Sequence, residues 1–199
     1  MDTFWFYLNL GFNHVTDWNG LDHFYFLIAL SLPFQFKDWK KLLLWVSLFT
    51  LGHSVSLIGS YFGWIKVEGS WVEFLIPITI GLTCLSILFN KNHSFSAGWK
   101  FNGITLFFGI IHGLGFAKYF SQIVFDDDAI LALLEFALGV EFAQLMIVII
   151  MIAINFIALN VLKFNSQKWQ VPMVSVPTAL SHPLQVPAPP SHPLPQCTY

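Results

Sequence analysis

The sequence is poor in charge, and this scarcity excludes several classes of protein. Only 10% of the 199 residues are charged, none is arginine, and the formal net charge is −2. A soluble domain carries about a quarter charged residues, so the ordinary composition of a water-exposed surface is excluded. The chain also lacks the basic stripe that neutralises phosphates, which excludes a nucleic-acid partner.

Cysteine is scarce throughout, and proline is scarce before residue 171. The cysteines are Cys84, in an apolar run, and Cys197, near the C-terminus, and they fit neither a disulfide framework nor a CxxC metal or redox motif. Eight of the ten prolines crowd into residues 171–199, where such density favours extended, unpacked backbone. We therefore divide the chain into a transmembrane helical domain, 1–170, and a proline-rich tail, 171–199, that is disordered or non-native.

Apolar sequence is abundant, with 56% hydrophobic and 18% aromatic residues. Five stretches approach or exceed the roughly 20 residues that a helix needs to cross a bilayer; they are 21–36, 42–65, 71–89, 101–123 and 129–162. The sequence thus predicts an all-α, polytopic transmembrane helical bundle of about five spans. The aromatic segment before them, 4–12, is predicted to be interfacial or re-entrant. The last stretch exceeds one perpendicular span, so we expect it to tilt, protrude or break near Gly139.

The distribution of lysine predicts the orientation of the bundle. Seven lysines follow the first, third and fifth spans, and two follow the others. Short cytoplasmic loops are enriched in lysine, so we expect the N-terminus outside and the end of the fifth helix in the cytoplasm. The seven are Lys37, Lys40, Lys41, Lys91, Lys100, Lys163 and Lys168, and the two are Lys66 and Lys118.

A polar motif stands at the outer end of the first span. His14, Asp17, Asp22 and His23 occur within ten residues. Ionisable groups at a helix centre in a bilayer cost roughly 2.5 kcal/mol or more, so polar groups near the spans need a reason. Imidazole nitrogens and carboxylate oxygens together suit a borderline divalent cation. The motif is also consistent with a helix N-terminus capped by Asn19 or Asp22, with its histidines at the interface.

Three further polar groups fall within the spans. His53, followed by Ser54, is central in the second span, His112 is near the middle of the fourth, and Glu141 shares a helix face with Gln144 in the fifth. A lone histidine of this kind is more often a hydrogen-bonded core residue than a ligand. Together they lie at similar depth on three helices, beside small residues, and so predict an intramembrane polar cavity. The candidate metal ligands are His14, Asp22, His23, His53, His112 and Glu141, with Ser54, Glu73, Glu135 and Gln144 in support.

Four segments, in order on successive spans, resemble the HupE/UreJ family of small bacterial membrane proteins: GFNH…GLDH, FTLGHS, HGLGFA and GVEFAQ. The resemblance covers about residues 10–150. It implies a helical-bundle permease for nickel or cobalt in the bacterial inner membrane, often encoded near hydrogenase or urease systems. It also implies that a histidine–aspartate–histidine motif, here His14, Asp22 and His23, matters for transport. The chain departs from the family in a longer connection after His14 and in its proline-rich tail, where members usually have a further helix.

The sequence therefore predicts a permease-like protein, not an enzyme, that takes Ni²⁺ or Co²⁺ as its substrate. No P-loop is present, so we expect an ion gradient, the membrane potential or downstream trapping to drive transport. Two alternatives stay open. One is an intramembrane hydrolase in which three histidines, an aspartate and Ser54 hold Zn²⁺ and an activated water. The other is a non-transporting subunit of a membrane complex. The expected partners are the lipid bilayer and the metal ion, and a membrane-protein partner or an oligomer is left open.

Overall fold

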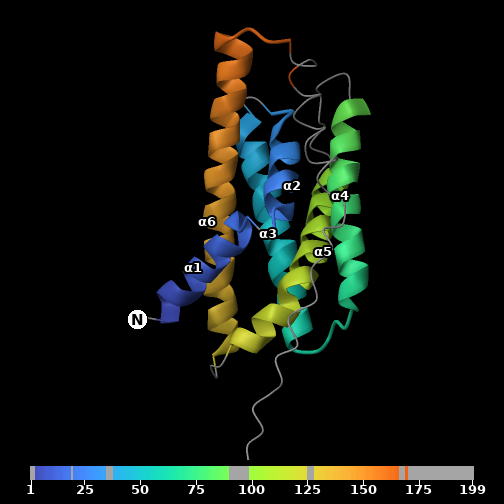
Figure 1. Cartoon of the computed structure of the whole chain (residues 1–199), viewed down its shortest axis with the longest axis vertical. Helices are drawn as coiled ribbons and strands as arrows, with labels where there is room; N and C mark the ends of the chain where they lie inside the picture. The colour runs from blue at the N-terminus through green and yellow to red at the C-terminus, as the bar shows by residue number, and fades with distance from the viewer. Residues whose placement is uncertain are drawn as a thin grey trace, which may run out of the picture.

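The computed structural model describes residues 3–18, 20–34, 38–89, 99–124, 128–165 and 169, with only the backbone described at 87–89 and 100. Every regular element in these residues is a helix (Figure 1). They are α1 (Thr3–Thr16), α2 (Asp22–Ser31), α3 (Trp39–Tyr61), α4 (Gly69–Phe89), α5 (Trp99–Ile123), α6 (Ala129–Phe156) and the π-helical turn η2 (Ile157–Val161). The all-α bundle expected from the sequence is confirmed. The predicted tail, 171–199, lies outside the described residues.

Four helices are long and apolar enough to cross a membrane, and they coincide with the last four predicted spans. These segments contain 23, 18, 23 and 33 residues in α3, α4, α5 and α6 with η2. Helix α6 continues through Gly139 without the break that was one of the expectations for this stretch. At 1.5 Å per residue, α6 and η2 together are about 50 Å long. The excess length protrudes beyond the other helices at the upper end of the bundle (Figure 1).

The first predicted span, 21–36, is replaced by the ten-residue helix α2. Ten helical residues rise about 15 Å, half of the hydrocarbon thickness. The helix ends before Pro33, which has no amide hydrogen and whose ring obstructs the carbonyl four residues earlier in a continuing helix. Helix α2 is enclosed by the bundle, and Phe26, Leu27 and Leu30 are buried in its core. A short helix is tolerated at this position because neighbouring helices surround its ends.

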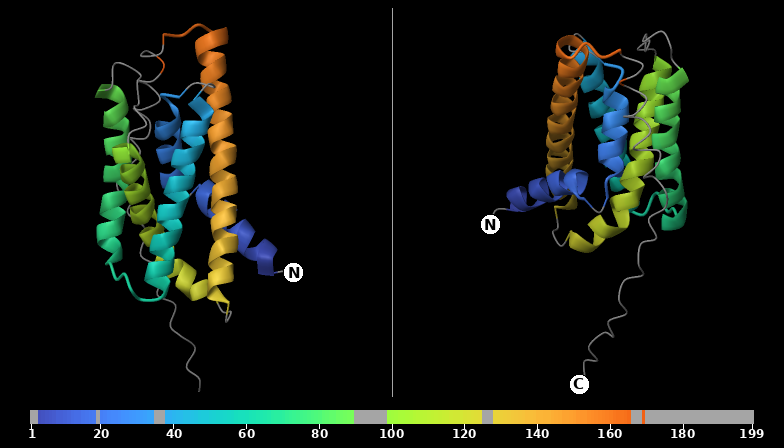
Figure 2. Two further views of the ribbon diagram at one scale, coloured as in Figure 1. Left: turned by 180° about the vertical axis from the view of Figure 1, so that it is seen from behind. Right: turned by 45° about the horizontal axis from the view of Figure 1, so that its top comes forward.

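Helix α1 crosses α6 at a steep angle and reaches into the bundle (Figures 1 and 2). Its N-terminus projects from the side, whereas its other end lies beside the start of α2. A Cβ on Gly11 would collide with the carbonyl oxygen of Phe136, and a Cβ on Gly139 would collide with that of Leu8. These two glycines therefore allow backbone contact between α1 and α6. The structure thus favours the re-entrant form of the predicted N-terminal segment.

Helices α3 and α5 run in the same direction and also touch through glycines. A Cβ on Gly109 would collide with the carbonyl oxygen of Phe49, and one on Gly113 would collide with that of His53. Gly52 approaches the backbone of α5 in the same way, at Leu106. Small residues four apart let two membrane helices approach closely. This contact fixes the position of α3 relative to α5, and with it the positions of the two mid-span histidines.

Candidate metal-binding site

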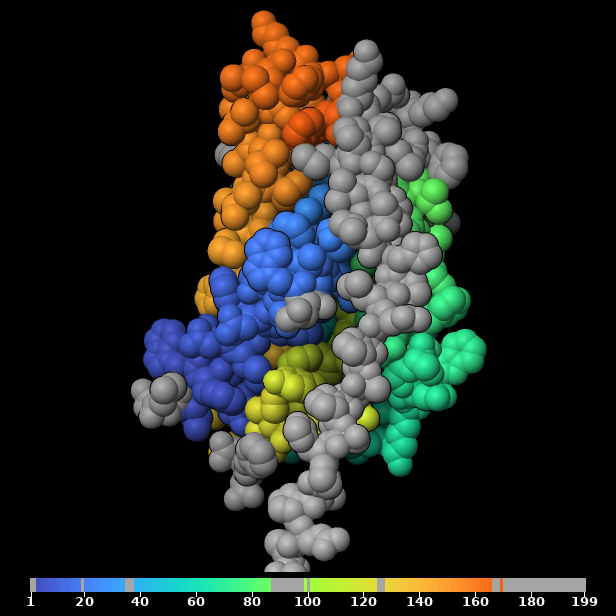
Figure 3. Space-filling view, in the orientation of Figure 1, coloured from blue at the N-terminus to red at the C-terminus, as the bar shows by residue number. Residues whose placement is uncertain are grey.

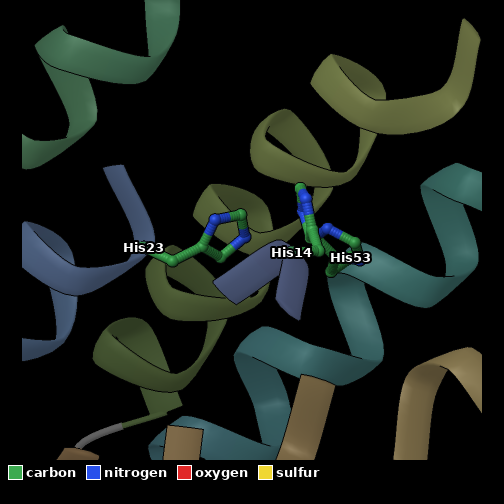
Figure 4. Close-up of side chains that lie close together, drawn as sticks. All are labelled: His14, His23 and His53. Carbon is green, nitrogen blue, oxygen red and sulfur yellow. The ribbon is translucent and has the colours of Figure 1, made fainter. Parts of the chain in front are cut away.

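Three histidines from three different helices face one another inside the bundle. His14 lies in the last turn of α1, His23 follows the first residue of α2, and His53 is central in α3 (Figure 4). One ligand nitrogen from each lies within 4.8 Å of the other two. The ring centroids are 4.7 Å apart for His14 and His23, 5.6 Å for His14 and His53, and 5.5 Å for His23 and His53. The sequence separates these residues by up to 39 positions, and the fold brings them together.

His112 of α5 adds a fourth imidazole to this group. Its ring centroid is 5.4 Å from that of His23. Its Nδ1 lies 2.9 Å from the carbonyl oxygen of Phe108. A carbonyl only accepts, so Nδ1 must carry the hydrogen and Nε2 retains its lone pair. A hydrogen bond of this kind orients a metal-binding imidazole and selects the tautomer in which Nε2 is the ligand atom.

The Nε2 atoms of all four histidines are buried, and none has a hydrogen-bond partner among the described residues. His23, His53 and His112 are at most 5% exposed. A buried polar atom without a partner costs about 1–3 kcal/mol, so four such atoms in one place are expensive unless something binds them. Imidazole nitrogen suits nickel, copper, zinc and iron. We call His14, His23, His53 and His112 the histidine cage.

Aromatic rings enclose the histidine cage. Phe116 lies 4.0 Å from the ring of His14 between centroids, and Phe49 lies 5.0 Å from the ring of His112. Phe136 packs at 5.7 Å from His14 and 6.2 Å from His53. These rings exclude water and lower the local dielectric, which strengthens electrostatic interactions within the cage.

A cavity of about 630 Å³ leads to the cage at His14. Polar side chains on its wall include Asn13, Thr16 and Asp17, and aromatic ones include Phe116 and Tyr119. Figure 3 shows α1 and the lower half of α5, the helices that supply this wall, side by side on one face. Of the four cage histidines, His14 alone belongs to the lining of this cavity. His14 is therefore the first nitrogen that a cation from the cavity would meet.

Burial of the His14 ring lowers its pKa from 6.5 to about 4, with a smaller contribution from His112 and an opposing one from the Asp17 carboxylate. Because the folded pKa is depressed, the unfolded chain binds more protons between pH 6.5 and 4. We therefore expect the metal-free protein to lose up to about 3 kcal/mol of stability over this range through His14. Thermal unfolding at pH 7 and 4.5 would measure this loss. His14→Phe should show a smaller pH dependence, and an unchanged one would contradict this expectation.

The other predicted site residues lie outside the group of three nitrogens. Asp22 is the first residue of α2 and is half-buried. Leu21 occupies the N-cap position and no described side chain caps this helix, so Asp22 is not its cap, and Asn19, the other predicted cap, lies outside the described residues. The hydroxyl of Ser54 donates to the carbonyl of Thr50 at 2.8 Å, which directs its hydrogen away from the cage. Glu73 is exposed on α4, and Glu135 is buried on α6.

Glu141 and Gln144 contact α3 at hydroxyl groups that the sequence analysis did not single out. Ser47 donates to Glu141 Oε1 at 2.6 Å, and Thr50 donates to Gln144 Oε1 at 2.9 Å. The signal in the sequence was a matched spacing. Ser47 and Thr50 are three residues apart on α3, and Glu141 and Gln144 are three residues apart on α6. The structure therefore places the four predicted histidines in the cage and Glu141 and Gln144 in this α3–α6 contact.

Comparison with known proteins agrees with this architecture. The family described as HupE / UreJ protein matches residues 1–183. No curated protein and no solved structure matches the chain. The match covers the helices, the histidine cage and the cavity, so the chain belongs to the HupE/UreJ family of membrane proteins.

Proposed function

We propose that this membrane protein is a permease for a divalent transition metal, nickel or cobalt, which it binds through the histidine cage. The observation that carries the proposal is the convergence of His14, His23 and His53, whose ligand nitrogens lie within 4.8 Å of one another. The supporting observation is that their Nε2 atoms, like that of His112, are buried without a partner among the described residues. Nitrogen donors of this kind suit late first-row cations better than magnesium or calcium.

The spacing of the cage is close to what a metal needs. Imidazole nitrogens bind zinc-like ions at about 2.1 Å, so two nitrogens of a tetrahedral site lie about 3.4 Å apart. The three ligand nitrogens lie within 4.8 Å, so closure requires small ring rotations and no movement of whole helices. A site that must contract slightly on binding can also release its ion, as transport through successive sites requires.

Charge balance also supports a divalent cation. Four neutral imidazoles bring no charge of their own, whereas Asp17 lines the adjoining cavity and Asp22 is the first residue of α2, beside His23. Two carboxylates near the cage offset the two charges of the ion and attract it into the cavity. In this proposal Asp22 acts through charge, and the imidazoles supply the ligand atoms.

The proposed direction of transport is inward. The cavity is lined by the last turns of α5 and the end of α1, toward the end of the bundle opposite Lys40, Lys41 and Lys163. Lysine-rich ends face the cytoplasm in multispanning membrane proteins. The cavity would then open to the outside of a bacterial inner membrane, and ions would pass from His14 toward the lysine-rich end.

The test is uptake into liposomes that contain the purified protein. We expect saturable accumulation of Ni²⁺ or Co²⁺ above protein-free liposomes, and its loss when His14 and His23 are both replaced by alanine. Glu73→Gln is the matched control because Glu73 is exposed on α4, outside the cage. Absence of uptake for Ni²⁺, Co²⁺, Zn²⁺ and Cu²⁺ alike, or a metal that stays bound through mild chelation, would contradict a permease.

A further inference from the structure

A second polar cluster lies where α3 meets α6. It consists of Ser47, Thr50, Glu141 and Gln144, joined by the hydrogen bonds from Ser47 to Glu141 at 2.6 Å and from Thr50 to Gln144 at 2.9 Å. We call these four residues the oxygen cluster. Its members come from predicted spans of high hydropathy, so two pairs of hydrogen-bonded polar side chains there need an explanation.

The two hydrogen bonds join neighbouring turns of α3 and α6. Helices α3 and α6 run in opposite directions (Figure 1). Ser47 therefore lies one turn above Thr50 on α3, in the orientation of Figure 1, and Gln144 lies one turn above Glu141 on α6. Since the upper residue of each helix bonds to the lower residue of the other, we infer that the four side chains lie within about one helical turn of each other. Thr50 precedes His53 by three residues, so this contact is about one turn from the histidine cage.

Two atoms of the oxygen cluster are buried without a hydrogen-bond partner among the described residues: Glu141 Oε2 and Gln144 Nε2. The side chain of Gln144 is completely buried, at 0% exposure. Rotation of its amide by 180° would let Nε2 donate to Thr50 Oγ1, while the Thr50 hydroxyl donates to the Val46 carbonyl, already 3.2 Å away. The amide oxygen would then take the place of the unpartnered nitrogen. In that arrangement both unpartnered atoms of the cluster are oxygens.

We propose that the oxygen cluster is a binding site for an alkali-metal cation such as Na⁺, separate from the histidine cage. Carboxylate, amide and hydroxyl oxygens are the ligands that hard cations prefer, whereas imidazole suits the transition metal. Glu141 is the single ionisable member of the cluster. One carboxylate and one monovalent cation form a neutral pair, which costs less inside a bilayer than the excess positive charge of a divalent ion would.

Binding of an alkali cation to the oxygen cluster could supply energy for the proposed transport. This coupling role rests on the proposed function, whereas the binding itself does not. Ser47 and Thr50 of the oxygen cluster are on the same helix as His53 of the cage. A cation that draws α3 and α6 together would thus act on a helix that carries a metal ligand. Binding of the alkali cation itself does not depend on whether the protein moves nickel.

The experiment measures thermal unfolding of the full-length, metal-free protein in sodium, potassium or choline chloride at equal ionic strength. Binding to the folded state raises the unfolding temperature, and we expect a saturable rise in sodium or potassium over choline. Glu141→Gln keeps the size of the side chain and an oxygen that can accept from Ser47, so it should fold. It should raise the half-saturating cation concentration by about 30-fold or more, because the carboxylate that offsets the charge of the cation is lost. Glu73→Gln should leave the response unchanged.

Identical unfolding in all three salts would overturn the proposal, as would a wild-type response in Glu141→Gln. The Ni²⁺-dependent stabilisation, measured in choline chloride, separates this outcome from failure of the permease proposal. If nickel stabilises the protein and alkali cations do not, only the oxygen cluster proposal fails. If alkali cations stabilise the protein through Glu141 and nickel does not, the oxygen cluster proposal holds and the permease proposal fails.

Discussion

Replacement of His53 by alanine is expected to weaken nickel binding by roughly a hundredfold. Four-ligand zinc sites in peptides bind with about 10–16 kcal/mol, so one imidazole supplies about 3 kcal/mol, equivalent to about a hundredfold in affinity. His53 is 1% exposed, and its ring centroid lies within 5.6 Å of those of His14 and His23, so no other described group can take its place without repacking. Equilibrium binding of Ni²⁺ to the purified protein would measure the change.

Phe49→Leu is the matched control for this result. Phe49 is fully buried and touches His23 and His112 with ring centroids 5.9 and 5.0 Å apart, but it has no ligand atom. Its substitution loosens the same part of the core and should change nickel affinity far less than His53→Ala. If both variants lose affinity equally, packing and not coordination explains the loss. If neither loses affinity, His53 is not a ligand.

A second large effect is expected from Gly109→Ala, which should destabilise the protein by about 3 kcal/mol or more. A Cβ on Gly109 would collide with the carbonyl oxygen of Phe49 and lie 2.9 Å from its carbonyl carbon, so α3 and α5 would have to separate. Overpacking of a close contact typically costs about 1–3 kcal/mol, and a backbone atom cannot move aside as a flexible side chain can. Separation of these helices would also move His112 away from the rest of the cage.

Gly103→Ala on the same helix provides the contrast. No described atom lies within 4 Å of a Cβ added at Gly103, so alanine there should stabilise the helix by about 0.5–1 kcal/mol. Unfolding of both variants in mixed micelles, followed by helical circular dichroism, would give the two changes. Equal effects would mean that the close approach of α3 and α5 does not limit stability.

The spans were the part of the fold most readily predicted from sequence. Hydrophobic length is sufficient for α3 to α6, because a bilayer requires about 20 apolar residues whatever the neighbouring helices are. It failed for α2, whose apolar run continues to Phe36 although the helix ends at Ser31. The length of an apolar run does not show that the helix stops before Pro33. It also does not show that neighbouring helices cover the ends of such a short helix. The angle of α1 depends on its glycine contact with α6, which is a tertiary feature.

The sequence named histidines that the structure brings together, and it did not show which of the other predicted residues would lie beside them. Mid-span position singled out His53, His112 and Glu141 as polar residues that are costly in a bilayer. Depth along a helix does not say in which direction a side chain points, and the structure places His53 in the cage but Glu141 against Ser47. His14, whose connection to Asp22 is longer than in the family pattern, joins the cage because α1 ends beside α2. Such convergence depends on helix packing, which periodicity alone does not determine.

The contact of α1 with α6 has a consequence for how the protein is made. Helix α1 packs, through Gly11 and Gly139, against α6, which follows it in the chain by more than a hundred residues. During synthesis α1 therefore lacks its contact with α6 until more than a hundred further residues have been made. His14 is carried on α1, so the nascent chain cannot hold its first imidazole in place until α6 arrives. The four imidazoles of the cage therefore come together only after α6 has been made.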